Sequence, residues 1–349
     1  MLQVSSSPLG NKQESRVGKR NDIVAAFERR VPESAVPIWE LEFQAWDAAS
    51  GKRVVLGHDF ESLSPVKQEK AMYTNAEIMI AVSAEMEFAA LTVPNAYWNQ
   101  APGQLAYYCL PGDTRFRQSI ILRKLAPANL MLVAITGGII EADYSAEFCY
   151  RLFNDPGSVD AMAQDRLRNA IEVAKRFRDC GAEAVVSPSD IADNHGPFFN
   201  PEQMNRWILP YLTQWSNAVK EMGLYAILHT DGNLTQYMDA IASTGLDAIQ
   251  AIDPVAGMDM RKTKDIVGRR LCLCGNIDCG LLLRGLPDDV YQSTRNLLAT
   301  CKAEGGLVLG ASNAVQPEVP MDNYRAMISA WKDFGQYEPK QEHSHDSRR

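Results

Sequence analysis

The sequence has no long hydrophobic run and no surplus of positive charge. Its 35 Lys and Arg residues are outnumbered by 43 Asp and Glu residues, which gives a formal net charge of -8. Proteins that neutralise nucleic-acid phosphates usually carry a basic surplus, so we expect no nucleic-acid partner. No stretch approaches the roughly 20 apolar residues of a membrane helix, and the first ten residues lack the basic start and apolar core of a secretory signal. We therefore expect a soluble, cytoplasmic protein with no membrane partner.

The cysteines are odd in number and scattered, and several familiar catalytic motifs are missing. The seven cysteines are an odd number spread through a large chain, which suits reduced thiols rather than a disulfide framework. Cys272 and Cys274 would face the same side of a strand, which favours core packing over metal binding. The chain also lacks the Walker A, GxGxxG, GxSxG and HExxH patterns. These absences exclude the commoner nucleotide-binding, hydrolase and zinc-protease signatures.

Short apolar runs alternate with longer stretches of helical spacing, which is typical of βα units around a parallel sheet. The length would allow two domains, but α/β barrels commonly reach it as one. We therefore predict an α/β fold: a (βα)8 TIM-type barrel in one domain over residues 21–338, between an N-terminal tail at 1–20 and a disordered tail at 339–349. The eight runs span residues 35–43, 88–94, 129–136, 182–188, 224–229, 246–252, 270–276 and 306–311.

Three segments between the predicted strands have distinct signals. Apolar spacing predicts a helix over 159–179 that ends at Cys180 and Gly181. Another helix is expected to open at Asn200, because Asn can cap it, a proline fits its first turn and a glutamine three residues later completes a capping-box-like pattern. The segment 97–128 is too irregular for a plain crossover helix, so we expect an extra hairpin or lid there, over the barrel mouth.

Polar residues follow many of the predicted strands. In a (βα)8 barrel, the carboxyl ends of the strands form the active face. Any one such residue is equally well explained as a helix cap or a turn residue, whereas their coincidence around one rim favours function. The candidates for substrate binding are Glu42, Asp190, Asn233, Asp253, Asn276, Asp278 and Asn313.

The turn His229-Thr230-Asp231-Gly232 is the strongest single candidate, because it directly follows the apolar run LYAIL. The histidine emerges at a strand end beside Asp231, and its candidate roles are general acid or base, substrate anchor and metal ligand. Tyr144 follows the third predicted strand, where it is either a hydroxyl donor over the mouth or a ring packed under the 97–128 segment. His195 lies in a loop, and we expect solvent or a backbone group to satisfy it.

A set of seven runs links the chain to a known superfamily. The runs are VPIWELEF, GAEAVVSPSDIAD, HGPFFNPEQMNRWILPYL, LHTDGN, STGLDAIQAIDP, LCGNID and GGLVLGASNAVQPEVPMDNYRAM. Together they resemble the uroporphyrinogen decarboxylase superfamily, from about Val36 to Tyr337. That superfamily holds the true decarboxylases and the barrel methyltransferases that move a methyl group from a corrinoid protein to an acceptor. The resemblance implies a barrel enzyme without specifying its reaction.

The arginines that define the true decarboxylases are missing. Those enzymes carry an RQAGR-type motif after the first strand, whose cations hold the carboxylates of the tetrapyrrole. Here the stretch reads EFQAW, with Glu42 and Trp46 in place of the two arginines. The histidine of the family's last-strand GHG corresponds to Ala311, whereas Tyr144 matches the family's active-site tyrosine. Because repulsion replaces attraction at Glu42, the resemblance argues against uroporphyrinogen as the substrate.

The cysteines of the zinc-dependent methyltransferases are missing as well. Those enzymes use a His-x-Cys turn after the fifth strand and a further cysteine after the last strand, because a metal-held thiolate is a strong nucleophile. This chain has His229-x-Asp231 and Ala311 at those positions. Glu42, His229 and Asp231 could form a mixed oxygen and nitrogen site for a harder metal than zinc. A metal-free transferase fits the sequence equally well.

The leading hypothesis from the sequence is a methyltransferase that moves a methyl group between a corrinoid (cobalamin) carrier and a small acceptor. In it, His229 and Asp231 position or deprotonate the acceptor, and Tyr144 joins them as a catalytic residue. The methyl donor would be a corrinoid, carried by a corrinoid protein as partner, and the resemblance makes a homodimer a further expectation. Zinc is an open question because two cysteine ligands are absent.

Two alternatives remain open at this point. One is a decarboxylase or lyase acting on a porphyrinogen or a smaller carboxylate, with His229 and the rim acids managing the proton that replaces carbon dioxide. The other is a non-catalytic barrel that binds a corrinoid or a tetrapyrrole.

Overall fold

A curled parallel sheet forms the centre of the computed structural model, which describes residues 18–94, 110 and 112–338. All neighbouring strands of the sheet run parallel, in the order β1-β2-β3-β6-β7-β8-β9. Strands rich in Val, Ile, Leu and Ala, buried on both faces, suit a parallel sheet covered by helices. The strands are β1 (Ala90–Thr92), β2 (Met131–Ile135), β3 (Ala184–Pro188), β6 (Tyr225–His229), β7 (Ala248–Gln250), β8 (Cys272–Cys274) and β9 (Leu307–Val308).

The first predicted strand, 35–43, closes the sheet without forming a regular ladder. Ile38 makes parallel bridges to Phe88, beside β1, and to Leu309, beside β9. The backbone N–H of Trp39 donates to the Leu309 carbonyl at 3.0 Å. Pro37 has no N–H to donate, which explains why this segment is held by isolated bridges. The segment still occupies the eighth position around the barrel, and the predicted (βα)8 fold is confirmed.

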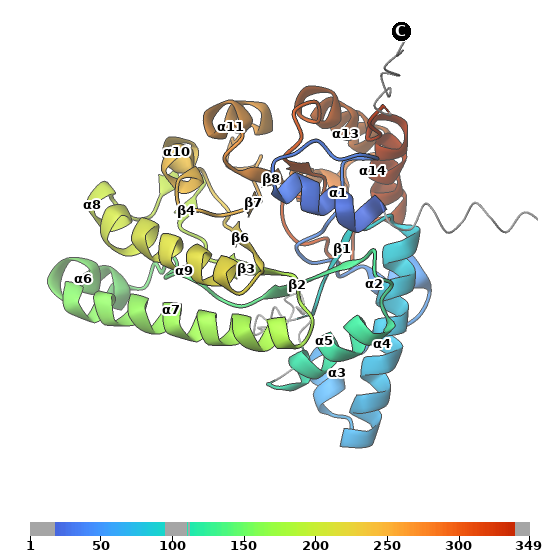
Figure 1. The fold of residues 1–349 in the computed structure, drawn as a ribbon, viewed down its shortest axis with the longest axis horizontal. Coiled ribbons are helices and arrows are strands. Elements are labelled where there is room, and N and C mark those ends of the chain that lie inside the picture. Colours follow the sequence, from blue (N-terminus) through green and yellow to red (C-terminus); the bar gives the residue numbers. More distant parts are fainter. Residues whose placement is uncertain (1–17, 95–109, 111, 339–349) are drawn as a thin grey trace, which may run out of the picture.

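Helices surround the sheet on its outer side (Figure 1). Neighbouring helices pack in pairs, among them α4 with α5, α7 with α9, and α13 with α14. The described helices are α1 (Gly18–Phe27), α2 (Trp46–Ser50), α3 (Gly57–Glu61), α4 (Pro65–Glu85), α5 (Thr114–Leu125), α6 (Ala146–Asn154), α7 (Pro156–Asp179), α8 (Pro201–Gln203), the π-helix η2 (Met204–Ile208), α9 (Leu209–Glu221), the 3-10 turn η3 (Thr235–Tyr237), α10 (Met238–Ala242), α11 (Met260–Val267), α12 (Cys279–Arg284), α13 (Pro287–Cys301) and α14 (Met321–Phe334). A two-stranded antiparallel hairpin, β4 (Ala192–Asp193) and β5 (Gly196–Pro197), follows β3.

Two apolar cores hold this arrangement together. The larger one lies between the sheet and the outer helices, and the smaller one fills the barrel interior. Ile23, Ala26 and Phe27 of α1 belong to the interior core, and the Phe27 ring contacts the ring of Tyr225 at the start of β6. Helix α1 therefore covers the amino-terminal ends of the strands, and the opposite, carboxyl-terminal rim is where polar residues gather.

The helix predictions are confirmed at two places and wrong at a third. Helix α7 ends at Asp179, before Gly181 with its φ of 93°, and the Asn200 and Gln203 side chains form the expected capping box, although the helix continues through a π-turn. Residues 114–125, predicted as part of a hairpin or lid, form the crossover helix α5 instead. It buries an apolar face against α4 and α7, on which Phe116 packs at 4.5 Å from Phe177. Residues 97–109 and 111 of that segment lie outside the described residues, as do residues 1–17 of the predicted N-terminal tail and the whole predicted tail 339–349.

Candidate functional site

Three adjacent strand ends bring the central polar residues together. Asp190 follows β3 by two residues, His229 is the last residue of β6, and Gln250 is the last residue of β7. Gly232 lets the turn after β6 pass close to the β4 backbone, because a Cβ there would come 2.6 Å from the carbonyl carbon of Ala192 and its φ is 90°. A glycine in the HTDG run is therefore required by close approach and by a left-handed backbone.

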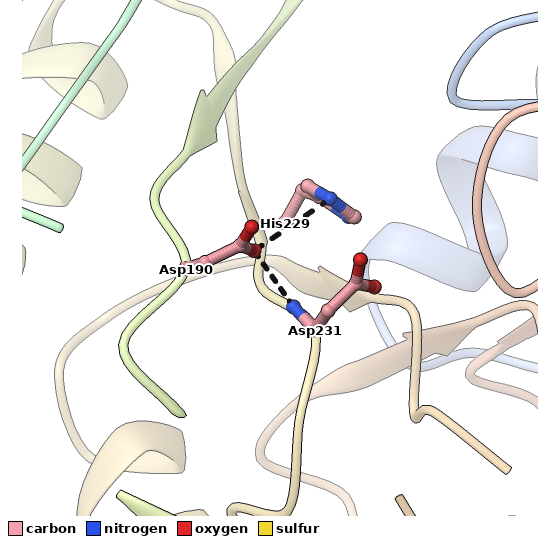
Figure 2. Close-up of side chains that lie close together, drawn as sticks. All are labelled: Asp190, His229 and Asp231. Atoms are coloured by element: carbon pink, nitrogen blue, oxygen red, sulfur yellow. Dashed lines mark hydrogen bonds and ion pairs between the residues drawn. The ribbon is translucent and has the colours of Figure 1, made fainter. Parts of the chain in front are cut away.

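Asp190, His229 and Asp231 form one cluster at the rim (Figure 2). One side-chain ligand atom of each lies within 4.8 Å of the others. His229 Nε2 is 3.9 Å from Asp190 Oδ1, and the Asp231 backbone N–H donates to the same oxygen at 2.9 Å. The imidazole is almost fully buried, whereas the Asp190 side chain is 53% exposed. Solvent or a ligand can thus reach the cluster from the Asp190 side.

Gln250 orients the imidazole. Its side-chain Nε2 donates to the backbone carbonyls of Ala311 at 3.1 Å and Ser312 at 3.3 Å, so its Oε1 faces His229 Nδ1. Because that oxygen can only accept, His229 Nδ1 carries a proton and donates to it, and Nε2 faces the Asp190 carboxylate. Sequence reasoning missed Gln250. The signal was a polar residue inside the apolar run LDAIQAI.

Asp231 is largely buried, and other charged residues surround it. Burial raises its pKa to about 6; the charge of His229 opposes that rise, and the carboxylates of Asp190 and Asp253 reinforce it. The side-chain amide of Asn313 donates to Asp231 Oδ2. Asp253 is held in place by the Gly232 N–H at 3.3 Å, so the structure places two further predicted site residues, Asn313 and Asp253, beside the cluster.

Glu42 does not join the cluster, which corrects the predicted metal set of Glu42, His229 and Asp231. Among the described residues, Asp190 supplies the third group instead. The strand order explains this, since Glu42 ends the segment between β9 and β1 and β6 stands on the opposite side of the barrel. Glu42 lies in a small apolar recess with Trp46, where its carboxylate accepts from the Gln44 amide at 2.9 Å and burial raises its pKa to about 7.

Tyr144 points toward the β4–β5 hairpin. Its hydroxyl donates to Asp193 Oδ2 at 2.9 Å, its ring packs edge-on against Phe198, and the residue is 63% exposed. Its hydroxyl bond to Asp193 lies outside the cluster, and part of the 97–128 segment under which its ring was predicted to pack lies outside the described residues.

Three other predicted binding residues bond to backbone groups. Asn233 donates to the Ala256 carbonyl and Asn276 donates to the Ile252 carbonyl, so both tie their loops to the segment that follows β7, whereas Asp278 caps α12. The cap explanation accounts for Asp278.

Residues 117–334, more than half of the chain, match the family model described as uroporphyrinogen decarboxylase (URO-D). The chain belongs to the uroporphyrinogen decarboxylase family. The resemblance seen in the sequence is thereby confirmed, and the named relatives in this family are enzymes, namely decarboxylases and a methyltransferase.

Individual relatives are distant. A uroporphyrinogen decarboxylase of Coxiella burnetii is 26% identical over 186 residues, 52% of this chain and 49% of the relative. A methylcobamide:CoM methyltransferase of Methanosarcina acetivorans is 25% identical over 167 residues, 47% of this chain and 46% of the relative. The matched stretches thus span about half the length of these curated relatives. Among solved structures, a methyltransferase from Methanosarcina mazei superposes with a TM-score of 0.64 at 16% identity, covering 91% of this chain and 99% of that one, which supports the fold.

A zinc–thiolate site of the kind outlined from the sequence does not fit this member of the uroporphyrinogen decarboxylase family. Asp231 and Ala311 stand at the positions where the sequence resemblance would place the two cysteines, and the Ala311 N–H donates to the buried Glu40 carboxyl at 2.8 Å. Cys279, which sequence reasoning did not consider for the site, lies nearby, where its sulfur accepts from the Asn313 N–H at 3.2 Å. Burial raises the pKa of Cys279 to about 11, so this thiol stays protonated at neutral pH.

Among the described helices, none combines the length and apolar character needed to cross a membrane.

Proposed function

We propose that this protein is a methyltransferase that moves a methyl group between a corrinoid carrier and a small acceptor. The main observation behind this proposal is the buried His229, whose Nε2 faces two carboxylates at the barrel rim. The relative named as a methylcobamide:CoM methyltransferase supports the reaction class. Glu42 and Trp46, standing where tetrapyrrole-binding arginines would be, argue against a substrate rich in carboxylates.

The residues of the cluster suit activation of an acceptor that carries an acidic proton. His229 Nε2 accepts that proton as the acceptor atom attacks the methyl carbon, and the bond between the methyl group and its carrier breaks with the electron pair left on the carrier. Asp190 and Asp231 stabilise the imidazolium that forms, and Gln250 keeps the ring in the required tautomer. Reaction in the opposite direction returns the proton from Nε2.

Methylcobalamin with candidate acceptors, such as a thiol and tetrahydrofolate, tests the proposal. Loss of methylcobalamin absorbance and the mass of the methylated acceptor report the reaction. We expect His229→Gln to be slower by about 100-fold or more, because a general base contributes that much. His58→Gln is the matched control, since His58 lies on α3 and its side chain is 82% exposed. Equal rates for His229→Gln and the control, or no methylated product with any acceptor class, would contradict the proposal.

A carboxy-lyase is the second candidate, and Asp231 favours it. A carboxyl whose pKa is raised to about 6 can hold a proton and return it to a carbanion after carbon dioxide leaves. Against it, the two arginines that line the hollow beside the end of β2, Arg151 and Arg166, are already paired with Glu147 and Glu141. Release of carbon dioxide from a carboxylate pool, absent in Asp231→Asn, would select this reaction. Corrinoid binding with no turnover in either assay would instead indicate a binding protein.

A further inference from the structure

We propose that Glu40 and Tyr324 are positioning residues for the His229 imidazole, although neither belongs to the rim cluster. They act through a continuous network of hydrogen bonds that passes through the backbone of Ala311 and the side chain of Gln250. The catalytic meaning of this network rests on the proposed function, but its effect on the imidazole can be measured without turnover.

The network links α14 to the end of β6. The Tyr324 hydroxyl, on α14, lies 2.7 Å from Glu40 Oε1, and Glu40 Oε2 accepts from the Ala311 N–H at 2.8 Å. The Ala311 carbonyl accepts from Gln250 Nε2 at 3.1 Å, and Gln250 Oε1 lies 2.5 Å from His229 Nδ1. Each of these five residues is at most 7% exposed, so water does not compete for their hydrogen bonds.

Ala311 is held by side chains rather than by the neighbouring backbone. Ile277, its bridge partner, makes its two hydrogen bonds with the residues on either side of Ala311. Among the described residues, only Glu40 accepts from the Ala311 N–H, and only Gln250 donates to its carbonyl. The neighbouring Gly310 leaves room for the carboxyl, since a Cβ there would come 3.1 Å from Glu40 Oε2. Because a buried N–H without an acceptor is costly, we expect loss of the Glu40 carboxyl to shift Ala311 and its carbonyl.

The direction of the Gln250 amide decides which ring nitrogen of His229 is free to accept a proton. While the carbonyls of Ala311 and Ser312 face the amide nitrogen, the amide oxygen faces Nδ1 and leaves Nε2 to act as the base. A flipped amide would set its NH2 group against Nδ1, which moves the ring proton to Nε2 and removes the base. A shift of Ala311 weakens one of the two contacts that prevent this flip.

Nitrogen-15 NMR of the full-length protein with labelled histidines tests the positioning role, at a pH at which the imidazole is neutral. The His229 signals are identified by their loss in His229→Gln. In the wild type we expect one tautomer, with the proton on Nδ1, and in Glu40→Leu a mixture of both tautomers. Glu40→Gln should keep the wild-type spectrum, because its amide can accept from the Ala311 N–H and donate to the Tyr324 oxygen. Thermal melting is recorded for every variant.

The methyl-transfer assay gives a second measurement. In Glu40→Leu we expect kcat to fall by about 10-fold or more with little change in KM, because the base is misplaced while the rest of the pocket is intact. Glu40→Gln should restore kcat. A structural role alone would lower the melting temperature without separating kcat from KM.

Tyr324→Phe is a milder variant that removes only the outermost hydrogen bond of the network, and we expect a smaller change of the same kind. Tyr291→Phe is its matched control. Tyr291 lies on α13, and its hydroxyl donates to the Asp333 carboxylate at 2.8 Å on the surface, outside the network. The control should keep the wild-type tautomer and kcat.

Several outcomes would overturn the positioning role. One is the wild-type tautomer and kcat in both Glu40→Leu and Tyr324→Phe, and another is a tautomer mixture in Glu40→Gln equal to that in Glu40→Leu. Equal changes in Tyr324→Phe and Tyr291→Phe would also overturn it. If Glu40→Leu does not fold, Tyr324→Phe and its control decide. A tautomer change in the variants of a protein that methylates no acceptor overturns the proposed reaction and leaves the positioning role standing.

Discussion

The buried carboxyl of Glu40 gives a stability prediction that can be worked out from the structure. Glu40 lies under the rim, where its Oε2 accepts from the Ala311 N–H at 2.8 Å and its Oε1 lies 2.7 Å from the Tyr324 hydroxyl. Burial raises its pKa from the ordinary value of 4.5 to about 8, against the effect of these two hydrogen bonds. The side chain is therefore largely protonated at neutral pH in the folded protein.

The sign follows from proton linkage. Between pH 4.5 and about 8 the folded state keeps a proton on Glu40 that the unfolded state has released. The free energy of unfolding consequently falls as the pH rises through this window and is unaffected by Glu40 below and above it. The difference between the pKa of Glu40 in the unfolded chain and its raised pKa in the folded protein corresponds to at most roughly 5 kcal/mol of unfolding free energy. Glu42, with its pKa raised to about 7, adds a smaller loss in the same direction.

Glu40→Gln removes this dependence, because the amide is neutral at every pH. Its oxygen can accept from the Ala311 N–H while its nitrogen donates to the Tyr324 oxygen. In urea unfolding, we expect the variant to match the wild type at about pH 5 and to exceed it by a few kcal/mol at about pH 9. Glu147→Gln is the control, since that side chain is 74% exposed. Parallel decline of the wild type and Glu40→Gln between these pH values would refute the reasoning.

Two further substitutions probe the rim. Gly232→Ala would place a Cβ 2.6 Å from the Ala192 backbone at a residue of positive φ. Gly223→Ala has a similar φ of 77° but open space around its Cβ. In urea unfolding we expect Gly223→Ala to lower the free energy of unfolding by roughly 1–2 kcal/mol and Gly232→Ala to lower it by more. Equal losses would show that close approach is not what requires Gly232. Tyr324→Phe removes the hydroxyl beside Glu40 and should cost roughly 1–3 kcal/mol in the same measurement. An unchanged midpoint would mean that this hydrogen bond contributes nothing.

Most of the fold follows from local sequence patterns, and its exceptions have local causes. Seven of the eight apolar runs contain the strands of the sheet, because a strand buried on both faces must be apolar throughout. The run 35–43, predicted in the same way, makes only isolated bridges, and Pro37 within it has no N–H to donate. The helix over 114–125 was missed because its basic residues mask a short apolar face that α4 and α7 cover.

Single residues of the site could be predicted from the sequence, but which of them come together in space could not. His229 and Asp231 are only two residues apart in sequence, so their proximity was expected. Choosing Asp190 over Glu42 as their partner requires knowing how far apart the strands stand around the barrel, which spacing along the chain does not encode. Gln250 was missed for a related reason, because its role depends on contacts with Ala311 that only the closed barrel creates.

Two residues that the sequence resemblance places at functional positions of the family are acidic in this chain. Glu42 stands where the resemblance implies a cation and Asp231 where it implies a thiol, so both add the capacity for negative charge to the barrel mouth. A substrate with several carboxylates would be repelled there, a cation would be attracted, and a neutral acceptor would be neither attracted nor repelled by the net charge. On the proposed function, the acceptor should therefore be uncharged or cationic in its free form. Raising the salt concentration should weaken the binding of a cationic acceptor and leave the binding of a neutral acceptor unaffected. The dependence of KM on ionic strength therefore distinguishes the two kinds of acceptor.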